Sequence, residues 1–284
     1  MITSLLAVDD GSLTLLAGVL GACFGSFLNV VAWRLPREES LLAPASHCPR
    51  CGTPLAWFDN VPVLSWLLLR GRCRHCQAPI RCRYVLVELL CSGLWVLMLL
   101  ARPEGLGAAP NPWLVVVAGW VLVSWLLPLV LIDLDHLWLP EPLCRWGLLL
   151  GLAFAALAGG LQGQPVLREL LFWHLLAAGV GLLGFEAVSA LAQRALGRPA
   201  LGLGDAKLAA LIGAWLGLSG LGATVLLAVA AGAAVGLVGR LSGRLGPLQP
   251  LPFGPFLALG AVVVWTTGHQ VWGQGLLRWM GWPL

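Results

Sequence analysis

Four cysteines in this chain form a pattern that can bind a metal ion. They stand as two pairs, Cys48-Pro-Arg-Cys51 and Cys73-Arg-His-Cys76, separated by the 21 residues 52–72. This spacing is close to that of four-cysteine zinc sites, in which each pair turns tightly enough for two thiolates to meet one tetrahedral ion. Disulfides or redox chemistry are the alternatives, and a reducing compartment would disfavour stable disulfides. The sequence therefore predicts a structural Zn²⁺ bound by Cys48, Cys51, Cys73 and Cys76.

Two carboxylates, Asp133 and Asp205, stand at the ends of long apolar segments. Asp133 lies in "LVLIDLDHLWLPEPL", and Asp205 lies in "GLGDAKL". An ionised group is costly to bury in hydrocarbon, so charges at a membrane boundary are candidates for function. Two opposed carboxylates in a poorly hydrated site share one proton, and one can act as the acid while the other activates water, as in an aspartyl protease. Position alone leaves a second interpretation open, in which each carboxylate is a helix-end charge favoured by the helix dipole.

The composition identifies the kind of protein that must position these groups. Of the 284 residues, 59% are hydrophobic and 11% are charged, and 15 are tryptophans. These values lie far outside those of a soluble globular domain and predict an all-α polytopic membrane protein.

Apolar runs of roughly the length that crosses a bilayer recur along the chain. We predict about eight transmembrane helices, of which the sixth and seventh are short. They cover residues 12–33, 85–101, 113–132, 143–160, 169–190, 206–219, 221–238 and 253–273. The chain then divides into a first transmembrane helix in 1–33, a small hydrophilic zinc-binding insert in 34–84, and a transmembrane bundle in 85–284. An insert of about 50 residues buries little apolar surface, so a metal would stabilise it.

The distribution of basic residues predicts the orientation in the membrane. With the N-terminus outside the cell, 14 of the 17 lysines and arginines fall in cytoplasmic segments, and only Arg102, Arg168 and Arg278 fall outside. Basic residues that flank spans are retained in the cytoplasm, so we expect a cytoplasmic insert and a site for Asp133 and Asp205 at the cytoplasmic face. Membrane topology and contact with anionic lipid account for the basic insert, and we predict no nucleic-acid partner.

Seven segments form an ordered set of motifs. They are "GSFLNVVAWRLP" (25–36), "SHCPRC" (46–51), "DNVPVLSWLLLRGRCRHC" (59–76), "IRCRYVLVELL" (80–90), "LIDLDHLWLPEPL" (131–143), "GLGDAKLAALIGAWLG" (202–217) and "PFGPFLALG" (252–260). In this order and on this topology they resemble the bacterial type IV prepilin peptidases. These are bifunctional leader peptidases and N-methyltransferases of the inner membrane, with an aspartyl protease site of the Gly-x-Gly-Asp type.

The resemblance implies an activity, a substrate and a cofactor. Asp133 and Asp205 would be the catalytic pair, with Asp135 only a neighbour. The substrates would be type IV prepilin or pseudopilin precursors, for pilus assembly or type II secretion, cut after a glycine at the cytoplasmic face. The new N-terminus would then be methylated with S-adenosylmethionine. Val85 and Ser92 stand where the family usually has proline and glycine, in the part of the chain linked with methylation.

Four polar residues near the insert are candidates for binding S-adenosylmethionine, which carries a sulfonium cation and a carboxylate. Glu88 and Asn29 would provide the acidic and amide groups, and Arg34 or Arg83 would bind the carboxylate. Each has a structural alternative. Glu88 can pair with Arg83 across a helix turn, Asn29 can bridge two spans, and either arginine can anchor the membrane boundary.

A proton-coupled transporter is the alternative from another functional class. It would also keep carboxylates such as Asp133 and Asp205 within a helical bundle. It would not explain the two Cys-x-x-Cys pairs or the "GSFLNVV" segment.

Overall fold

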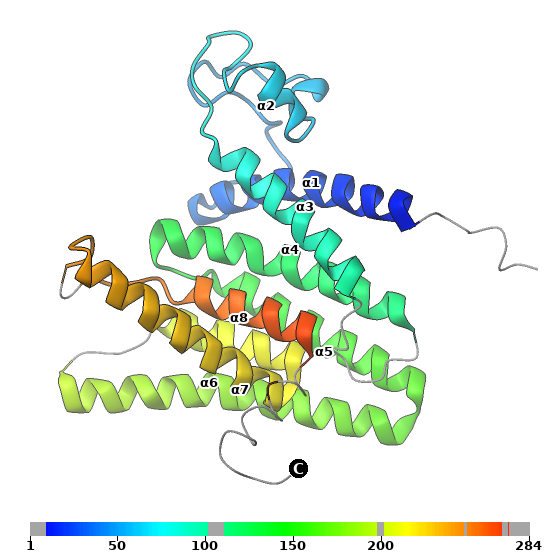
Figure 1. Ribbon diagram of the computed structural model, residues 1–284, viewed down its shortest axis with the longest axis vertical. Helices are drawn as coiled ribbons and strands as arrows, with labels where there is room; N and C mark the ends of the chain where they lie inside the picture. Colours follow the sequence, from blue (N-terminus) through cyan, green and yellow to red (C-terminus); the bar gives the residue numbers. More distant parts are fainter. Residues whose placement is uncertain (1–9, 102–110, 198–201, 247–248, 269–271, 273–284) are drawn as a thin grey trace, which may run out of the picture. The chain divides into compact units, whose positions relative to one another are not determined.

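The computed structural model describes residues 10–101, 111–197, 202–246, 249–268 and 272 (Figure 1). Three arginines of the charge count, Arg102, Arg198 and Arg278, lie outside these residues. The chain forms two compact units, Met1–Leu100 and Ala101–Leu284. The first unit joins the predicted insert to a helix on either side of it. The predicted division at 33/34 and 84/85 stays a prediction.

The first unit is a pair of antiparallel helices that carries the insert. Its elements are α1 (Asp10–Arg34), η1 (Leu35–Arg37), η2 (Trp57–Asn60), α2 (Leu64–Leu68) and α3 (Arg83–Ala101). Glycines on α1 let the two backbones approach closely. A Cβ at Gly21 would lie 2.9 Å from the Cα of Ser92, and one at Gly25 would lie 2.8 Å from the Cα of Glu88. Contacts between small residues are typical of packed membrane helices. These glycines therefore fix the register of α1 against α3.

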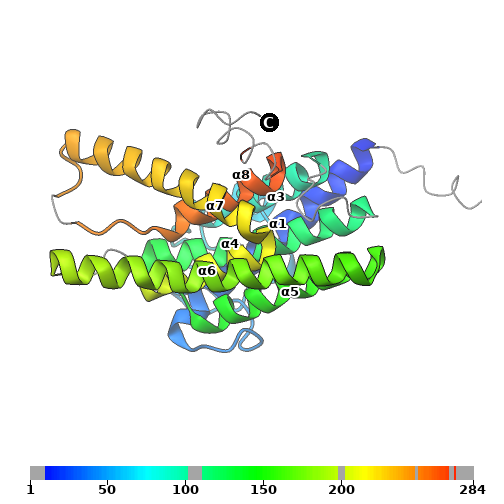
Figure 2. The same cartoon turned by 90° about the horizontal axis from the view of Figure 1, so that it is seen from below.

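The second unit is a helical bundle in which one element reverses direction. Its helices are α4 (Pro112–His136), α5 (Glu141–Gln162), α6 (Gln164–Leu196), α7 (Leu203–Leu241) and α8 (Gly254–Thr267). Within α7, Gly217 has φ 67° and ψ −175°, a conformation that is not helical and is essentially confined to glycine. Figures 1 and 2 show the yellow first half of α7 and its gold second half running in opposite directions from this point.

The first half of α7 forms the core of the second unit. Its side chains from Leu208 to Leu216 are buried on every face. Close packing against α6 depends on glycine, since a Cβ at Gly213 would lie 2.6 Å from the backbone of Ala177. At the reversal, Nδ1 of His174 lies 2.9 Å from the carbonyl oxygen of Ala214. This contact pairs a helix-end carbonyl that would otherwise be buried without a partner.

The all-α membrane fold is confirmed. Within the described residues, six helices are long and apolar enough to cross a membrane, and α8 is a shorter apolar helix. Seven of the eight predicted segments fall on helices; of the eighth, 253–273, residues 254–267 form α8, and residues 269–271 and 273 lie outside the described residues. The predicted spans 206–219 and 221–238 correspond to the two halves of α7. Because α7 is one continuous element, it is counted as a single candidate span. The described part of the chain contains only two isolated β-bridges, both in the insert.

Candidate active site and metal centre

Asp133 lies at the C-terminal end of α4, where its side chain is only 5% exposed. Its Oδ2 accepts a hydrogen bond of 3.0 Å from the backbone N–H of Gly254, at the N-terminus of α8. Helix N-termini favour anions because their first N–H groups have no partner within the helix. A side chain at 254 would not fit, since a Cβ there would lie 2.6 Å from the same carboxylate oxygen. Gly254 therefore holds the Asp133 carboxylate by direct backbone contact.

Asp205 lies in the first turn of α7 and is held in a similar way. Its Oδ2 accepts a hydrogen bond of 3.0 Å from the N–H of Gly202, and its own N–H donates to the Gly202 carbonyl. Gly204 brings this turn against the segment that follows α4, because a Cβ at 204 would lie 3.0 Å from the Cβ of Leu139.

The two carboxylates thus come from helix ends at the same end of the bundle. Asp133 is buried and Asp205 is half-buried, so Asp205 is the more accessible of the two. Asp135 differs from both because it is exposed. It follows Asp133 by two positions, and helix residues so spaced lie on different faces. The arrangement has the parts that a shared-proton acid and base require.

The four predicted zinc ligands come together in the insert. The Sγ atoms of Cys48, Cys51, Cys73 and Cys76 all lie within 4.8 Å of one another, and those of Cys48 and Cys76 are 3.8 Å apart. A tetrahedral ion with Zn–S bonds of about 2.3 Å places its sulfurs about 3.8 Å apart. All four are free thiols, and these separations far exceed a disulfide bond. The cluster therefore fits a four-thiolate metal ion.

Two loops of the same shape present these cysteines. In the first loop, the Cys48 carbonyl accepts from the N–H of Gly52, and residues 47 and 54 form a β-bridge. In the second, the Cys73 carbonyl accepts from Gln77, and residues 72 and 79 form the matching bridge. Gly52 and Gln77 both have positive φ. The signature Cys-x-x-Cys-x-x-Pro occurs in both loops and marks them as a repeat in the sequence.

Local hydrogen bonds favour the thiolate form of two ligands. The Thr53 hydroxyl, 3.3 Å from the Cys51 sulfur, can donate to a thiolate and lowers the pKa of Cys51 to about 6. The backbone amides of Cys76 and His75 lower the pKa of Cys73. Because the thiolate is the form that binds metal, both cysteines are prepared for it.

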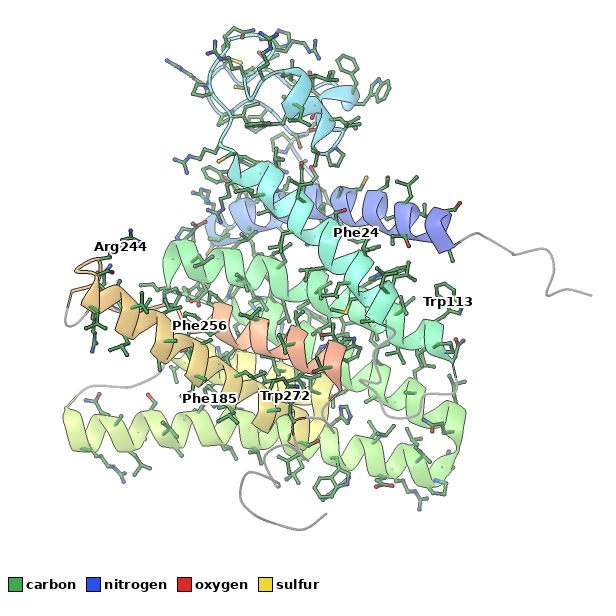
Figure 3. All side chains as sticks on the ribbon, viewed as in Figure 1. Phe24, Trp113, Phe185, Arg244, Phe256 and Trp272 are labelled. Carbon is green, nitrogen blue, oxygen red and sulfur yellow. The ribbon has the colours of Figure 1, made fainter. Side chains whose placement is uncertain are left out.

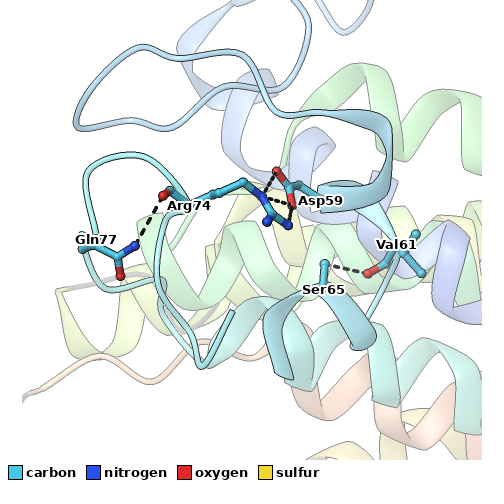
Figure 4. A network of polar contacts seen from close by, with 5 residues as sticks. All are labelled: Asp59, Val61, Ser65, Arg74 and Gln77. Carbon is cyan, nitrogen blue, oxygen red and sulfur yellow. Dashed lines mark hydrogen bonds and ion pairs between the residues drawn. The ribbon is translucent and has the colours of Figure 1, made fainter. Parts of the chain in front are cut away.

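An ion pair ties the second cysteine loop to the rest of the insert (Figure 4). The guanidinium of Arg74 donates from Nε and from its terminal nitrogen to Asp59, with a shortest distance of 2.7 Å. The Asp59 side chain is 5% exposed, and the pair raises the pKa of Arg74. In the same region the Ser65 hydroxyl donates to the Val61 carbonyl at 2.7 Å. These contacts hold η2, α2 and the loop together.

The four predicted methyl-donor residues all lie in the first unit, and three are buried. Asn29 donates to the carbonyls of Gly25 and Tyr84, both at 3.2 Å, and so bridges α1 and α3. Arg34 donates to two carbonyls of the loop that follows α1, at 2.9 and 2.7 Å. Arg83 begins α3 and is half-buried. Their cofactor roles stay predictions.

Glu88 has a partner that sequence reasoning missed. Its Oε2 accepts a hydrogen bond of 2.7 Å from the N–H of Val63, and the Ser26 hydroxyl also bonds to this carboxylate. Val63 has φ 61° and ψ −53°, and the N–H of Leu64 donates to the Pro62 carbonyl across it. This is a strained γ-turn, rare for a β-branched residue. Buried Glu88 holds the strained turn in place.

Two protein families match parts of the chain. Residues 19–102 match the bacterial peptidase A24 N-terminal domain, and residues 120–237 match the type IV leader peptidase family. No solved structure matches the chain.

Three relatives illustrate the similarity. A type 4 prepilin-like proteins leader peptide-processing enzyme of Escherichia coli is 37% identical over 88% of this chain and 93% of its own length. A prepilin leader peptidase/N-methyltransferase of Burkholderia pseudomallei is 39% identical, over 89% and 85%. One of Myxococcus xanthus is 44% identical over 81% of this chain, which spans only 64% of that relative. The similarities give the transporter alternative no support.

Proposed function

Because the chain belongs to the type IV leader peptidase family, we propose that it is a membrane-embedded aspartyl protease that removes the leader of type IV prepilin or pseudopilin precursors. The observation that carries the proposal is the pair of carboxylates Asp133 and Asp205, each held by a glycine N–H at the start of a helix. It acts as a multi-pass protein of the bacterial inner membrane, as its six apolar helices and its relatives support.

The chemistry follows from two carboxylates that share one proton. The ionised carboxylate takes a proton from water as the oxygen of that water attacks the scissile carbonyl carbon. The protonated carboxylate donates to the carbonyl oxygen, and a proton then reaches the leaving nitrogen as the C–N bond breaks. The pair titrates as a unit, so neither role belongs permanently to Asp133 or Asp205. The N–H groups of Gly254 and Gly202 keep the carboxylates oriented throughout.

The orientation of the chain would place this reaction at the cytoplasmic face. The excess of basic residues in alternate segments between the predicted spans supports a periplasmic N-terminus and a cytoplasmic insert. A precursor whose apolar helix lies in the membrane and whose short leader remains in the cytoplasm would present its cleavage site at the level of the two carboxylates.

A second activity would reside in the first unit. The names of the relatives support transfer of a methyl group from S-adenosylmethionine to the new N-terminus. Glu88, Asn29, Arg34 and Arg83 remain the proposed donor-binding residues. Zn²⁺ bound by the four cysteines would act as a structural staple for the insert, since four thiolates leave no open position for catalysis.

Leader cleavage by single-residue variants tests the protease assignment. Asp133→Asn and Asp205→Asn should each abolish release of the leader from a prepilin while the protein keeps its melting temperature, because a shared-proton pair fails when either member is lost. Asp135→Asn, a matched change two residues away on the same helix, should keep most of the activity. Cleavage by either of the first two variants at a normal rate would exclude the pair.

A further inference from the structure

An apolar groove of about 500 Å³ lies beside the candidate active site. It is formed by α6, the second half of α7 and the residues that lead into α8, and its lining is almost wholly apolar. The residues of this aromatic groove are Phe185, Val188, Val225, Val229, Gly232, Ala233, Leu251, Phe253 and Phe256. Figure 3 labels Phe185 and Phe256, which approach it from α6 and α8. In Figure 2 the second half of α7 diverges from α6, and the chain before α8 runs between them.

One residue of the groove wall is next in the chain to the glycine that contacts Asp133. Phe253, in its wall, immediately precedes Gly254, whose N–H donates to Asp133 at 3.0 Å. The rings of Phe253 and Phe185 lie 6.3 Å apart, centroid to centroid. From this end the groove follows α7 from Ala233 back to Val225, toward the reversal at Gly217 and away from the active-site end. At 1.5 Å per residue this is a length of about 12 Å, or roughly two turns of a helix.

Small residues on α7 keep the groove open. A Cβ at Gly232 would lie 3.4 Å from the Phe256 ring, and one at Gly236 would lie 3.4 Å from Leu251. Each methyl group would just reach the opposite wall, so any larger side chain at these positions would enter the groove.

We propose that the aromatic groove binds the apolar residues that follow the scissile bond of the precursor, an inference that rests on the proposed protease function. One end of the groove is at Phe253, the residue before the Gly254 that contacts Asp133, and the groove then follows α7 into the bundle. A chain cut at Asp133 and Asp205 would therefore lay the first turns of its membrane helix along the groove. The rings of Phe185, Phe253 and Phe256 suit large apolar and aromatic side chains in such a segment.

A lipid acyl chain is the competing occupant in a bilayer. A lipid chain could bind at any apolar surface and would need no connection to Asp133. The groove wall has such a connection, because Phe253 lines the groove and the next residue, Gly254, contacts Asp133. The volume also lies within the range of pockets that bind specific ligands. These two features favour the substrate segment.

Cleavage kinetics of the full-length protein in nanodiscs test the inference. Gly232→Leu should fill the groove and lower kcat/KM for a prepilin about tenfold or more, mainly through KM, because one large apolar side chain loses its binding site. Ala234→Leu is the matched control on the same helix, since Ala234 is exposed, lies outside the groove lining and, two residues from Gly232, is on another face. It should stay within twofold of wild type. Equal kinetics for the two variants, with an active wild type, would overturn the groove assignment and leave the protease function standing.

A crosslinking measurement separates the inference from turnover and from misfolding of a variant. A benzophenone amino acid at Val229, in an Asp205→Asn background, should crosslink to the first residues after the cleavage site of an added prepilin. Crosslinks to lipid alone, unchanged by excess prepilin, would refute the proposal. If the wild type does not cleave but the prepilin crosslinks at Val229, the protease function fails while the groove assignment holds.

Discussion

Replacing Gly254 by alanine is the smallest change that reaches the candidate active site. The new methyl carbon would lie 2.6 Å from Oδ2 of Asp133 and 3.2 Å from its Cγ. An ordinary contact begins at 3.4 Å, so the carboxylate or the start of α8 must move by about 0.8 Å. Both are buried, which leaves the carboxylate no open space in which to relax.

The expected loss follows from that displacement. A misplacement of about 1 Å at a reacting group can reduce a rate about 10²-fold, which corresponds to about 2.7 kcal/mol of activation free energy. The hydrogen bond from the Gly254 N–H to a charged carboxylate is itself worth about 1.5–3 kcal/mol, and it would be bent or lengthened. We therefore expect Gly254→Ala to lower kcat for leader cleavage by about 10- to 100-fold.

The assay compares leader release by Gly254→Ala, by wild type and by Gly222→Ala. The last variant adds the same methyl group to α7 where nothing lies within 4 Å, so its kcat should stay within twofold of wild type. Melting temperatures in the same detergent exclude global unfolding, and methyl transfer to pre-cleaved pilin provides a second measure of integrity. A Gly254→Ala variant that is folded and cleaves at the wild-type rate would refute the role of this contact.

Three further predictions concern other parts of the chain. Purified protein should contain about one equivalent of zinc, which Cys51→Ser should lose together with protease resistance of the insert, and a metal-free preparation with an ordered insert would contradict this. Glu88→Gln should impair methyl transfer but not cleavage, while Asp205→Asn should still methylate pre-cleaved pilin; the reverse pattern would indicate one shared pocket. Gly217→Ala should cost about 1–3 kcal/mol and lower both melting temperature and cleavage, because alanine does not adopt the backbone conformation found there, and an unchanged melting temperature would count against the reversal.

The parts of the fold that could be predicted are those with a local chemical signal. Apolar runs mark helices because the membrane requires about 20 apolar residues per span, and the described part of every predicted run is largely helical. The Cys-x-x-Cys pairs mark a metal cluster because two thiolates so spaced can meet one ion, and the four sulfurs do converge. Each signal lies within a few residues or within a single helix.

The features that were missed depend on contacts between distant segments. Gly254 and Asp133 are 121 residues apart, and nothing in "PFGPFLALG" reveals which carboxylate the N–H of Gly254 will contact. Likewise, the sequence suggests a cofactor or an ion pair as the partner of Glu88. Its carboxylate instead accepts a hydrogen bond from the N–H of Val63, 25 residues earlier. A backbone donor has no signature in the sequence, so its choice of acceptor follows only from the assembled fold.

The reversal at Gly217 links the fold to the site. Asp205 lies at the N-terminus of α7 and Gly254 lies at the N-terminus of α8, the next helix, yet both must be at the same end of the bundle to hold the two carboxylates. An unbroken α7 would carry the chain to the opposite end before α8 began. Because the chain turns back at Gly217, the second half of α7 returns it to the end where it started. One glycine conformation, in a run where several glycines look alike in the sequence, therefore allows the N–H of Gly254 to reach Asp133.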